Sequence, residues 1–530
     1  MREVLSLENL TVGQFLHRTV QHFPDRSAME YAGQVWTYRE LEGAVTSTAR
    51  RLLSWGVKRG DRVGLWCEME PNVIFLLYAL PRIGAAAVLL NTSLQRSELA
   101  ERLRRTEVSR LIITDGCKAS SFPALCQGLI QEVPTLEAVL YAGQSGESAG
   151  LQTLGKLEET SEEKLVQAEA QVTSQDIGYI LYTSGTTSMP KAVMSTQFSR
   201  VNNGIQQAHD LGATEVDRFC AAMPVFHCFC LSVNVMAACA SGGCLYIPES
   251  RKTSVILEAL SEGKCTIFSS VPTLFHAILC RPDFGNWDLS SLRTGFIGGN
   301  LYPPEFFRQV NDGFGFTLLS SLGQTEATAG LTVAYLDDSL EVRATTVGHF
   351  MNHVEGKILH IETGKEQPTG ETGEICVRGY LVMAGYYGQP DETAKVIDAE
   401  GWLHTGDMGY LDEAGNVHLT GRLKELIIRG GENISPAEVE AALGDCCEIE
   451  ECKAIGVPDY HYGEEVCLCA VRPKGSILGE TEIRALLSRK LAPFKVPKYI
   501  LFLDELPKTA TGKVRPNELS RIIRERLALS

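Results

Sequence analysis

The stretch Tyr-Thr-Ser-Gly-Thr-Thr-Ser-Met-Pro-Lys, residues 182–191, follows a short apolar run, residues 177–181, that is typical of a buried strand. Its small hydroxyl side chains, single glycine and single lysine make a loop rich in N–H and O–H donors. A polyphosphate needs such donors, a close backbone and a counter-charge. The Walker A spacing G-x-x-x-x-G-K-[ST] is absent. Taken alone, the stretch predicts either an anion-binding loop after a strand or a solvated linker.

The overall composition sets limits on the class of protein. A chain of 530 residues is too long for one ordinary hydrophobic core, so two or three domains are expected. The formal net charge of −16 argues against general nucleic-acid binding, because phosphate backbones attract basic surfaces. The first ten residues do not resemble a secretory signal. The longest apolar stretch, residues 231–247, is interrupted by polar residues and glycines, which favours a buried helix, turn and strand over a transmembrane segment.

The sixteen cysteines are scattered along the chain. The close pairs at 228/230, 446/447 and 467/469 do not have zinc-knuckle spacing. Most cysteines lie in apolar runs, where free thiols behave as small hydrophobic side chains. We therefore expect a reducing compartment and a cytoplasmic protein.

Helix and strand patterns alternate through the first half of the chain. Thr37 and Glu40 have the spacing of a capping box ahead of an expected helix to residue 53. The alternation predicts a mostly parallel sheet covered by helices. Helices are expected near residues 12–23, 40–53, 72–83 and 98–105, and strands near 28–31, 35–38, 63–67, 87–90 and 111–114.

A change of composition marks the C-terminal part. Residues 370–431 are rich in glycine and charge with short strand-like runs, and helix and strand patterns then alternate again. We place the main boundary at Lys424, which gives a large domain, 1–423, and a small domain, 424–530, of about a hundred residues. The expected class is α/β: a large N-terminal domain of mostly parallel sheets flanked by helices with a β-rich subdomain, and a small, mobile α+β C-terminal domain.

Further short motifs follow other strand-like runs. Thr325 and Glu326 could hold a phosphate and a magnesium ion, and Gly298 and Gly299 allow close backbone approach to a planar ring. Asp407 and Arg422 suit the two hydroxyls of a ribose, and Lys513 ends a Gly/Thr-rich loop. Any one of these alone is more often a turn with a solvated charge.

Taken in this order, the motifs resemble the adenylate-forming superfamily of acyl-CoA synthetases, luciferases and peptide-synthetase adenylation domains. The resemblance extends from residues 37–41 to Lys513. It implies a two-step reaction in which a carboxylate attacks the α-phosphate of ATP, giving acyl-AMP and pyrophosphate, and a thiol, usually coenzyme A, then displaces AMP. Such an enzyme must neutralise charge that builds on the α-phosphate.

The resemblance implies a role for each matching position. Lys513 would bridge the carboxylate and the α-phosphate, which Thr325 also contacts, while Glu326 holds Mg²⁺. Asp407 and Arg422 would bind the ribose. The β- and γ-phosphate loop would comprise Thr183, Ser184, Gly185, Thr186, Thr187 and Lys191, and the walls of the adenine and acyl sites would comprise Gly298, Gly299, Asn300, Ser321, Leu322, Gly323 and Gln324.

The second step implies a rotation of the small domain, since Lys513 would block the thiol. Lys424 matches the family's hinge position, and a loop that includes Arg429, Gly430, Gly431 and Glu432 would then guide the pantetheine of coenzyme A. The chain departs from the family at Ser188 and Ala192, where glycine is usual, and at Leu322, where an aromatic residue is common. These departures bear on ATP affinity and leave the reaction class unchanged.

The sequence indicates less about the acid substrate than about the reaction. Residues 224–230 match the segment at the mouth of the acyl pocket and carry no acidic side chain, so an amino-acid ammonium would lack a partner. His227 either contacts the carboxylate or is a packed histidine satisfied by a backbone carbonyl. An apolar tunnel or slot is suggested by Phe226, Phe229, Val271, Leu301 and Leu322. Residues 337–358 look most like the medium-chain branch of the fatty acyl-CoA synthetases.

Four functions stay open from the sequence. The first is a medium-chain fatty acid–CoA ligase, and the second is a ligase for an aryl or small branched acid. The third is a stand-alone activating enzyme that loads a carrier protein. The fourth is a non-catalytic nucleotide-binding relative, against which the presence of Glu326, Asp407, Arg422 and Lys513 argues. ATP, Mg²⁺ and coenzyme A are the expected cofactors. No nucleic-acid partner and no transmembrane segment are expected, a carrier protein is a possible partner, and the oligomeric state is open.

Overall fold

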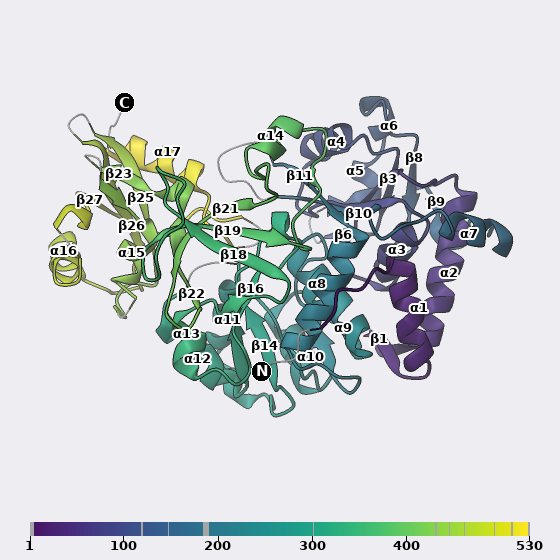
Figure 1. The fold of residues 1–530 in the computed structure, drawn as a ribbon, viewed down its shortest axis with the longest axis horizontal. Coiled ribbons are helices and arrows are strands. Elements are labelled where there is room, and N and C mark those ends of the chain that lie inside the picture. The colour runs from purple at the N-terminus through teal and green to yellow at the C-terminus, as the bar shows by residue number, and fades with distance from the viewer. Residues whose placement is uncertain are drawn as a thin grey trace.

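Two lobes of unequal size make up the computed structural model of the chain (Figure 1). The larger lobe contains the elements up to β22, and the smaller lobe, green to yellow in Figure 1, contains β23 onward. The structure describes residues 5–117, 120–146, 148–183, 190–299, 302–429, 432–444, 446–459, 462–491, 493–509 and 512–527.

An eight-stranded sheet forms one half of the large lobe. Five neighbouring strand pairs from β10 to β9 are parallel, whereas β11 and β20 are antiparallel to their neighbours. The loop of residues 182–191 thus joins two paired strands, β10 and β11. In spatial order the strands are β20 (Gly385–Tyr386), β11 (Ala192–Thr196), β10 (Ile177–Tyr182), β4 (Ala86–Leu89), β3 (Arg62–Trp66), β5 (Arg110–Ile113), β8 (Ala138–Tyr141) and β9 (Gln152–Thr153).

A second layer of strands covers the other half of the large lobe. A four-stranded sheet has the order β12 (Arg218–Cys220), β13 (Cys244–Ile247), β1 (Ser27–Tyr31) and β2 (Gln34–Thr37). The parallel pair β14 (Thr294–Ile297) and β15 (Thr317–Ser320) ends beside the candidate site. Two short antiparallel pairs join β6 (Gly116–Cys117) to β7 (Ser120–Ser121) and β16 (Thr332–Val333) to β17 (His349–Phe350).

The remaining strands form two further sheets. The antiparallel sheet β18 (Val354–Leu359), β19 (Gly373–Gly379), β21 (Leu403–Leu411) and β22 (Val417–Arg422) completes the large lobe. The small lobe has the strand order β24 (Glu432–Ile434), β23 (Ile427–Arg429), β26 (Gly463–Val471) and β25 (Glu451–Asp459), and β27 (Tyr499–Leu503) pairs in parallel with β26. The predicted α/β class, with its β-rich subdomain and small α+β domain, is confirmed.

Helices cover the sheets, as the parallel topology requires. Figure 1 shows α1, α2, α3 and α7 grouped on one side of the large lobe and α4, α5 and α6 on another. The helices are α1 (Val12–His22), α2 (Tyr38–Ser54), α3 (Pro71–Arg82), α4 (Arg96–Arg105), α5 (Phe122–Leu125), α6 (Leu129–Glu132), α7 (Glu162–Glu169), α8 (Gln197–Asp210), α9 (Ala237–Ser241), α10 (Thr253–Ser261), α11 (Pro272–Leu279), α12 (Pro304–Phe314), α13 (Leu340–Thr345), α14 (Pro390–Ala394), α15 (Pro436–Ala441), α16 (Glu480–Ser488) and α17 (Pro516–Leu527).

Local sequence signals explain several of these boundaries. Thr37 caps α2, and the side chain of Glu40 returns a contact to the Thr37 backbone, which confirms the predicted capping box. The apolar stretch 231–247 divides into a π-helix (Cys230–Met236), α9 and β13, with a left-handed turn at Gly242, where φ is 72°. Among the described residues, no helix is both long and apolar enough to cross a bilayer.

Candidate active site

The C-terminal lysine lies against the large lobe. Lys513 sits on a turn in which the Thr509 N–H donates to the Lys513 carbonyl over 2.7 Å. A β-carbon added to Gly512 would lie 2.9 Å from Oγ1 of Thr273, so the turn packs directly on α11. Burial and Arg422 lower the pKa of Lys513, while Cys228 and Asp407 oppose this shift. The fold therefore brings this ammonium to the same place as the predicted ribose pair.

Asp407 and Arg422 are cross-strand partners on β21 and β22. The Arg422 Nε lies 2.9 Å from Oδ1 of Asp407, which is 2% exposed. Burial raises the pKa of Asp407 and Arg422 opposes this shift. Within the described part of the chain, Oδ2 of Asp407 is buried and has no hydrogen-bond partner. Because a buried carboxylate oxygen without a donor is costly, this atom suits a hydroxyl of a bound ligand.

A short hydrogen-bonded turn presents Asp407. Gly406, at φ 70°, donates its N–H to Oε1 of Glu374 over 3.0 Å. The Thr405 hydroxyl donates to the Ile375 carbonyl over 2.6 Å and accepts the Asp407 N–H at 3.1 Å. Glu374 belongs to the neighbouring strand β19, so the sheet fixes the turn. The sequence singled out Asp407 but not Glu374, which lies 32 residues from Gly406.

Glu326 and Lys191 are joined through an aromatic ring. The Tyr386 hydroxyl donates to Oε1 of Glu326 over 2.9 Å, and burial followed by Glu326 raises the Tyr386 pKa. The Lys191 Nζ lies 4.7 Å from the centre of the Tyr386 ring and 2.5 Å from Oε2 of Glu392. Lys191 thereby holds the pKa of Glu392 at about 2. Tyr386 and Glu392 were not predicted, because only the pairing of β20 with β11 brings them here.

The backbone around Thr325 and Glu326 is unusual. These two residues form a 3₁₀ turn that ends at Thr328, where φ is 63° and ψ is −49°. Arg200, fully buried on α8, donates to the Thr328 carbonyl over 2.8 Å, and the Thr328 hydroxyl donates to the Leu381 carbonyl over 2.7 Å. A strained residue persists only where its surroundings hold it, and such residues gather at functional sites. Burial lowers the pKa of Arg200 to about 10.

His227 is a neutral histidine whose tautomer is fixed. The Phe229 N–H donates to His227 Nδ1 over 3.2 Å, so Nδ1 is an acceptor and the ring proton lies on Nε2. Burial and Lys513 lower the pKa of His227 to about 4. The Thr325 hydroxyl contacts Sγ of Cys228 at 3.8 Å, which places Thr325 beside this segment. The alternative from the sequence was a packed histidine that donates to a backbone carbonyl. Nδ1 does not fit that alternative, because it accepts a backbone N–H.

Glycines bring the strand ends close together. A β-carbon on Gly298 would lie 2.8 Å from the Ser321 carbonyl, and one on Gly323 would lie 2.3 Å from the Ala329 carbonyl. Gly299 has φ 93°. Leu322 is 7% exposed and packs in the core beneath this region, whereas Nε2 of Gln324 is buried without a hydrogen-bond partner in the described part of the chain. Adenine packing against Leu322 stays a prediction.

Some predicted positions lie outside the described residues: Ser184, Gly185, Thr186, Thr187, Asn300, Leu301, Gly430 and Gly431, together with the side chains of Lys424 and Glu432. The ends of the phosphate loop are described. Thr183 N–H donates to the Lys191 carbonyl over 3.0 Å, and Lys191 N–H donates to the Thr183 hydroxyl over 3.2 Å. The loop is thus closed at its base.

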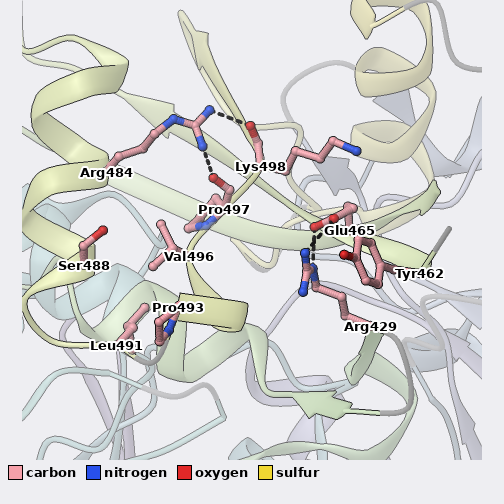
Figure 2. Close-up of a pocket in the computed structure, with 10 residues that line it drawn as sticks. All are labelled: Arg429, Tyr462, Glu465, Arg484, Ser488, Leu491, Pro493, Val496, Pro497 and Lys498. Carbon is pink, nitrogen blue, oxygen red and sulfur yellow. Dashed lines mark hydrogen bonds and ion pairs between the residues drawn. The ribbon is translucent and has the colours of Figure 1, made fainter.

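A cavity of about 600 Å³ lies in the small lobe around Arg429 (Figure 2). The Arg429 Nε and Nη2 lie 2.7 and 3.0 Å from the Glu465 carboxylate, and the guanidinium lies 4.1 Å from the centre of the Tyr462 ring. Figure 2 shows Arg484 reaching the carbonyls of Pro497 and Lys498 on the opposite wall. This cavity is separate from the group around Lys513, and its basic lining suits an anion.

Comparisons with known proteins identify the family of the chain. Residues 16–387 match the family described as AMP-binding enzyme, and residues 438–513 match the AMP-binding enzyme C-terminal domain. The chain therefore belongs to the AMP-binding enzyme family, which confirms the predicted resemblance and the expectation of an enzyme.

Three similar proteins illustrate the relationship. The putative acyl-CoA synthetase YngI of Bacillus subtilis is 35% identical over 96% of both chains. The mitochondrial medium-chain acyl-CoA ligase ACSF2 of Rattus norvegicus is 32% identical over 99% of this chain and 89% of the relative. The ATP-bound crystal structure of MatB from Rhodopseudomonas palustris superposes with a TM-score of 0.85 at 27% identity, over 98% of this chain and all of that one.

Proposed function

We propose that this chain is an ATP-dependent carboxylic acid–CoA ligase that acts on medium-chain fatty acids. It would form acyl-AMP and pyrophosphate first, and acyl-CoA and AMP second. The observation that carries the proposal is the position of Lys513, which the small lobe delivers to Asp407, Arg422 and His227 of the large lobe. A compact ammonium there suits the negative charge that grows on an α-phosphate as a carboxylate attacks it.

The large lobe fits a nucleotide with its metal ion. The unpartnered Oδ2 of Asp407 would accept a hydrogen bond from a ribose hydroxyl, and Gly298 and Gly299 carry no side chain that would keep a flat ring from their backbone. The Glu326 carboxylate, held by the Tyr386 hydroxyl, is the hard oxygen ligand that Mg²⁺ prefers. Mg²⁺ would neutralise phosphate charge, while Lys191 would bind the terminal phosphates. Coenzyme A is proposed as the thiol acceptor.

The acyl side favours an acid without an ammonium group. His227 is neutral with its proton on Nε2, so it can donate a hydrogen bond to a carboxylate oxygen. Residues 224–230 provide no carboxylate to pair with an amino group. Relatives named medium-chain acyl-CoA ligases support an alkyl chain. An aryl or small branched acid, and transfer to a carrier protein, are the alternatives that the experiment below separates.

The two half-reactions would use two arrangements of the lobes. We propose domains at 1–423 and 424–530, with Lys424 as the hinge, and the separate match of residues 438–513 to a C-terminal domain supports this division. After rotation, Arg429 and the loop that follows it would face the site. Glu465 holds the Arg429 guanidinium in a fixed orientation, which suits a residue that meets an anionic thiol substrate.

We also propose a reducing compartment, and the cytoplasm in particular. The cysteines whose side chains the structure describes are all free thiols, and most are buried among apolar side chains. Such thiols persist where disulfide formation is not favoured.

A pyrophosphate-release assay over a panel of acids tests the proposal. The panel contains straight-chain acids from short to long, benzoate, a branched acid and an amino acid, each with MgATP. We expect the highest kcat/KM with medium-chain acids and acyl-CoA formation once coenzyme A is added. Maximal rates with benzoate would show that the substrate is an aryl acid. Acyl transfer to a carrier protein but not to coenzyme A would show that the acceptor is a carrier protein. Failure of every acid to release pyrophosphate would reject the ligase.

A further inference from the structure

Three side chains with metal-binding atoms meet on the β-rich sheet of the large lobe. Glu374 and Cys376 lie on β19, and His404 lies on β21 directly opposite Cys376. Within the described parts of the chain, these are the three His, Cys, Asp or Glu residues whose ligand atoms all lie within 4.8 Å of one another. No sequence motif joins these three residues, because residues 376 and 404 meet only through the pairing of β19 with β21.

The distances between these atoms are close to those of a tetrahedral zinc site. His404 Nδ1 lies 3.5 Å from Sγ of Cys376 and 2.8 Å from Oε2 of Glu374. Zinc bonds of about 2.3 Å to sulfur and about 2.0 Å to nitrogen or oxygen, at tetrahedral angles, separate neighbouring ligand atoms by roughly 3.3–3.6 Å. The sulfur–nitrogen distance already fits. The nitrogen–oxygen distance is that of a hydrogen bond and needs to open by about half an ångström.

The surroundings suit a bound cation. The Cys376 side chain is fully buried, the Glu374 side chain is 13% exposed and the His404 side chain is 32% exposed. A metal ion can therefore reach the three ligand atoms past the edge of the imidazole ring. On the other side of the ring, Oδ2 of Asp398 lies 3.9 Å from His404 Nε2. A carboxylate on the outer nitrogen of a metal-bound histidine orients the ring and raises its basicity. Lys357, the other cross-strand neighbour of Cys376, places its Nζ over the Trp402 ring at 3.9 Å.

We propose that Glu374, Cys376 and His404 form a zinc site. The Cys376 thiolate, His404 Nδ1 and Glu374 Oε2 bind Zn²⁺, and a water molecule takes the fourth position. Binding releases the Cys376 thiol proton to solvent, and the imidazole proton that lies between Nδ1 and Oε2 moves to Nε2, which faces Asp398. No oxidation change occurs, since zinc has no redox chemistry in such sites.

The site is connected to the nucleotide turn. The other oxygen of Glu374 accepts the Gly406 N–H at 3.0 Å, directly before Asp407. Zinc on Oε2 would therefore fix the carboxylate that holds this turn. The zinc site itself does not rest on the proposed function, because metal binding and thermal stability are measured without any acid or coenzyme A.

The chain provides a matched control for a thiol–imidazole pair. Sγ of Cys280 lies 3.5 Å from His276 Nε2 at the C-terminal end of α11, which equals the sulfur–nitrogen distance at the proposed site. That pair is exposed and belongs to no three-residue group among the described residues. The double variant His276→Gln/Cys280→Ser removes it and leaves the β19–β21 group intact.

Cobalt provides the direct test, because Co²⁺ bound to a thiolate gives a charge-transfer absorption in the near ultraviolet. The full-length protein is stripped with a chelator, desalted and titrated with Co²⁺, then with Zn²⁺ as competitor. We expect the band to saturate at about one equivalent in the wild type and in the double variant, and to disappear with Cys376→Ser. Zn²⁺ should raise Tm in the first two proteins only.

A second variant covers the case in which Cys376→Ser folds poorly. His404→Asn keeps an N–H donor for Glu374 but removes the imidazole, so it should retain its fold and lose at least tenfold in Co²⁺ affinity. Absence of the band in the wild type overturns the proposal. So does a band that survives Cys376→Ser, or one that the His276→Gln/Cys280→Ser variant abolishes.

Discussion

Removal of a single hydroxyl group tests what positions the Glu326 carboxylate, which we propose as a ligand of Mg²⁺. Tyr386→Phe deletes the donor that lies 2.9 Å from Oε1 of Glu326. The phenylalanine ring fills the same buried volume, since Tyr386 is 5% exposed, and it keeps its face toward Lys191. The substitution therefore removes one hydrogen bond to a charged group and little packing.

The size of the effect follows from that bond. A hydrogen bond to an ionised group contributes about 1.5–3 kcal/mol, and each 1.36 kcal/mol corresponds to about tenfold in rate. We expect kcat/KM for MgATP in the pyrophosphate-release assay to fall by roughly 10- to 150-fold. Part of the loss should be recovered at high Mg²⁺, because a free carboxylate can still bind the ion when its concentration is raised.

Thioester formation from supplied acyl-AMP and coenzyme A should change less than twofold, since that step releases no pyrophosphate. Tyr387→Phe is the matched control: its hydroxyl donates to Glu107 over 2.5 Å at the surface. Equal losses in both half-reactions of Tyr386→Phe, or the same loss in Tyr387→Phe, would refute the assigned role of the Glu326 contact.

Three further outcomes are expected. Lys513→Ala should reduce acyl-AMP formation by about 100-fold or more but spare thioester formation from supplied acyl-AMP. The control Lys508→Ala, on the same turn, should spare both steps. Loss of both steps in Lys513→Ala would contradict the mechanism with two arrangements of the lobes. Lys424→Pro should slow only the second half-reaction by stiffening the hinge, and an unchanged rate would remove Lys424 from that role. Burial raises the Glu70 pKa from 4.5 to about 8. The folded state therefore holds a proton that the unfolded state has lost, so stability falls as pH rises from 4.5 to 8. In urea unfolding, Glu70→Gln should remove up to about 5 kcal/mol of that decline, with Glu68→Gln as control. An unchanged slope would assign the decline to other groups.

The sequence predicted the parts of the site that follow strands directly. Residues 298–299 and 321–326 lie where β14 and β15 end, and Asp407 and Arg422 lie on paired strands, as the motifs indicated. The capping box at Thr37 could likewise be predicted from the sequence, because it depends on two residues three positions apart. These features are local, or they depend only on which end of a strand carries the loop.

The contacts that orient the site could not be predicted from the sequence, because they join residues far apart in the chain. Tyr386 lies 60 residues from Glu326, and Glu392 lies 201 residues from Lys191. No periodicity or motif specifies such a pair. It is fixed by the short pairing of β20 with β11 at the edge of the large sheet. The sequence therefore identified the candidate ligands of the nucleotide, while the groups that hold them required the fold.

Arg200 is an example of a residue that holds the site in place without being a candidate ligand of the nucleotide. An arginine on a helix is ordinarily expected at the surface, yet this one is fully buried and donates to Ser232, Ser195 and the Thr328 carbonyl rather than to a carboxylate. A buried charge without an opposite charge costs several kcal/mol. A neutral side chain of similar size would remove that cost but would leave the Thr328 carbonyl, at a strained φ of 63°, without its donor. The charge is therefore best understood as the support that holds the turn carrying Thr325 and Glu326.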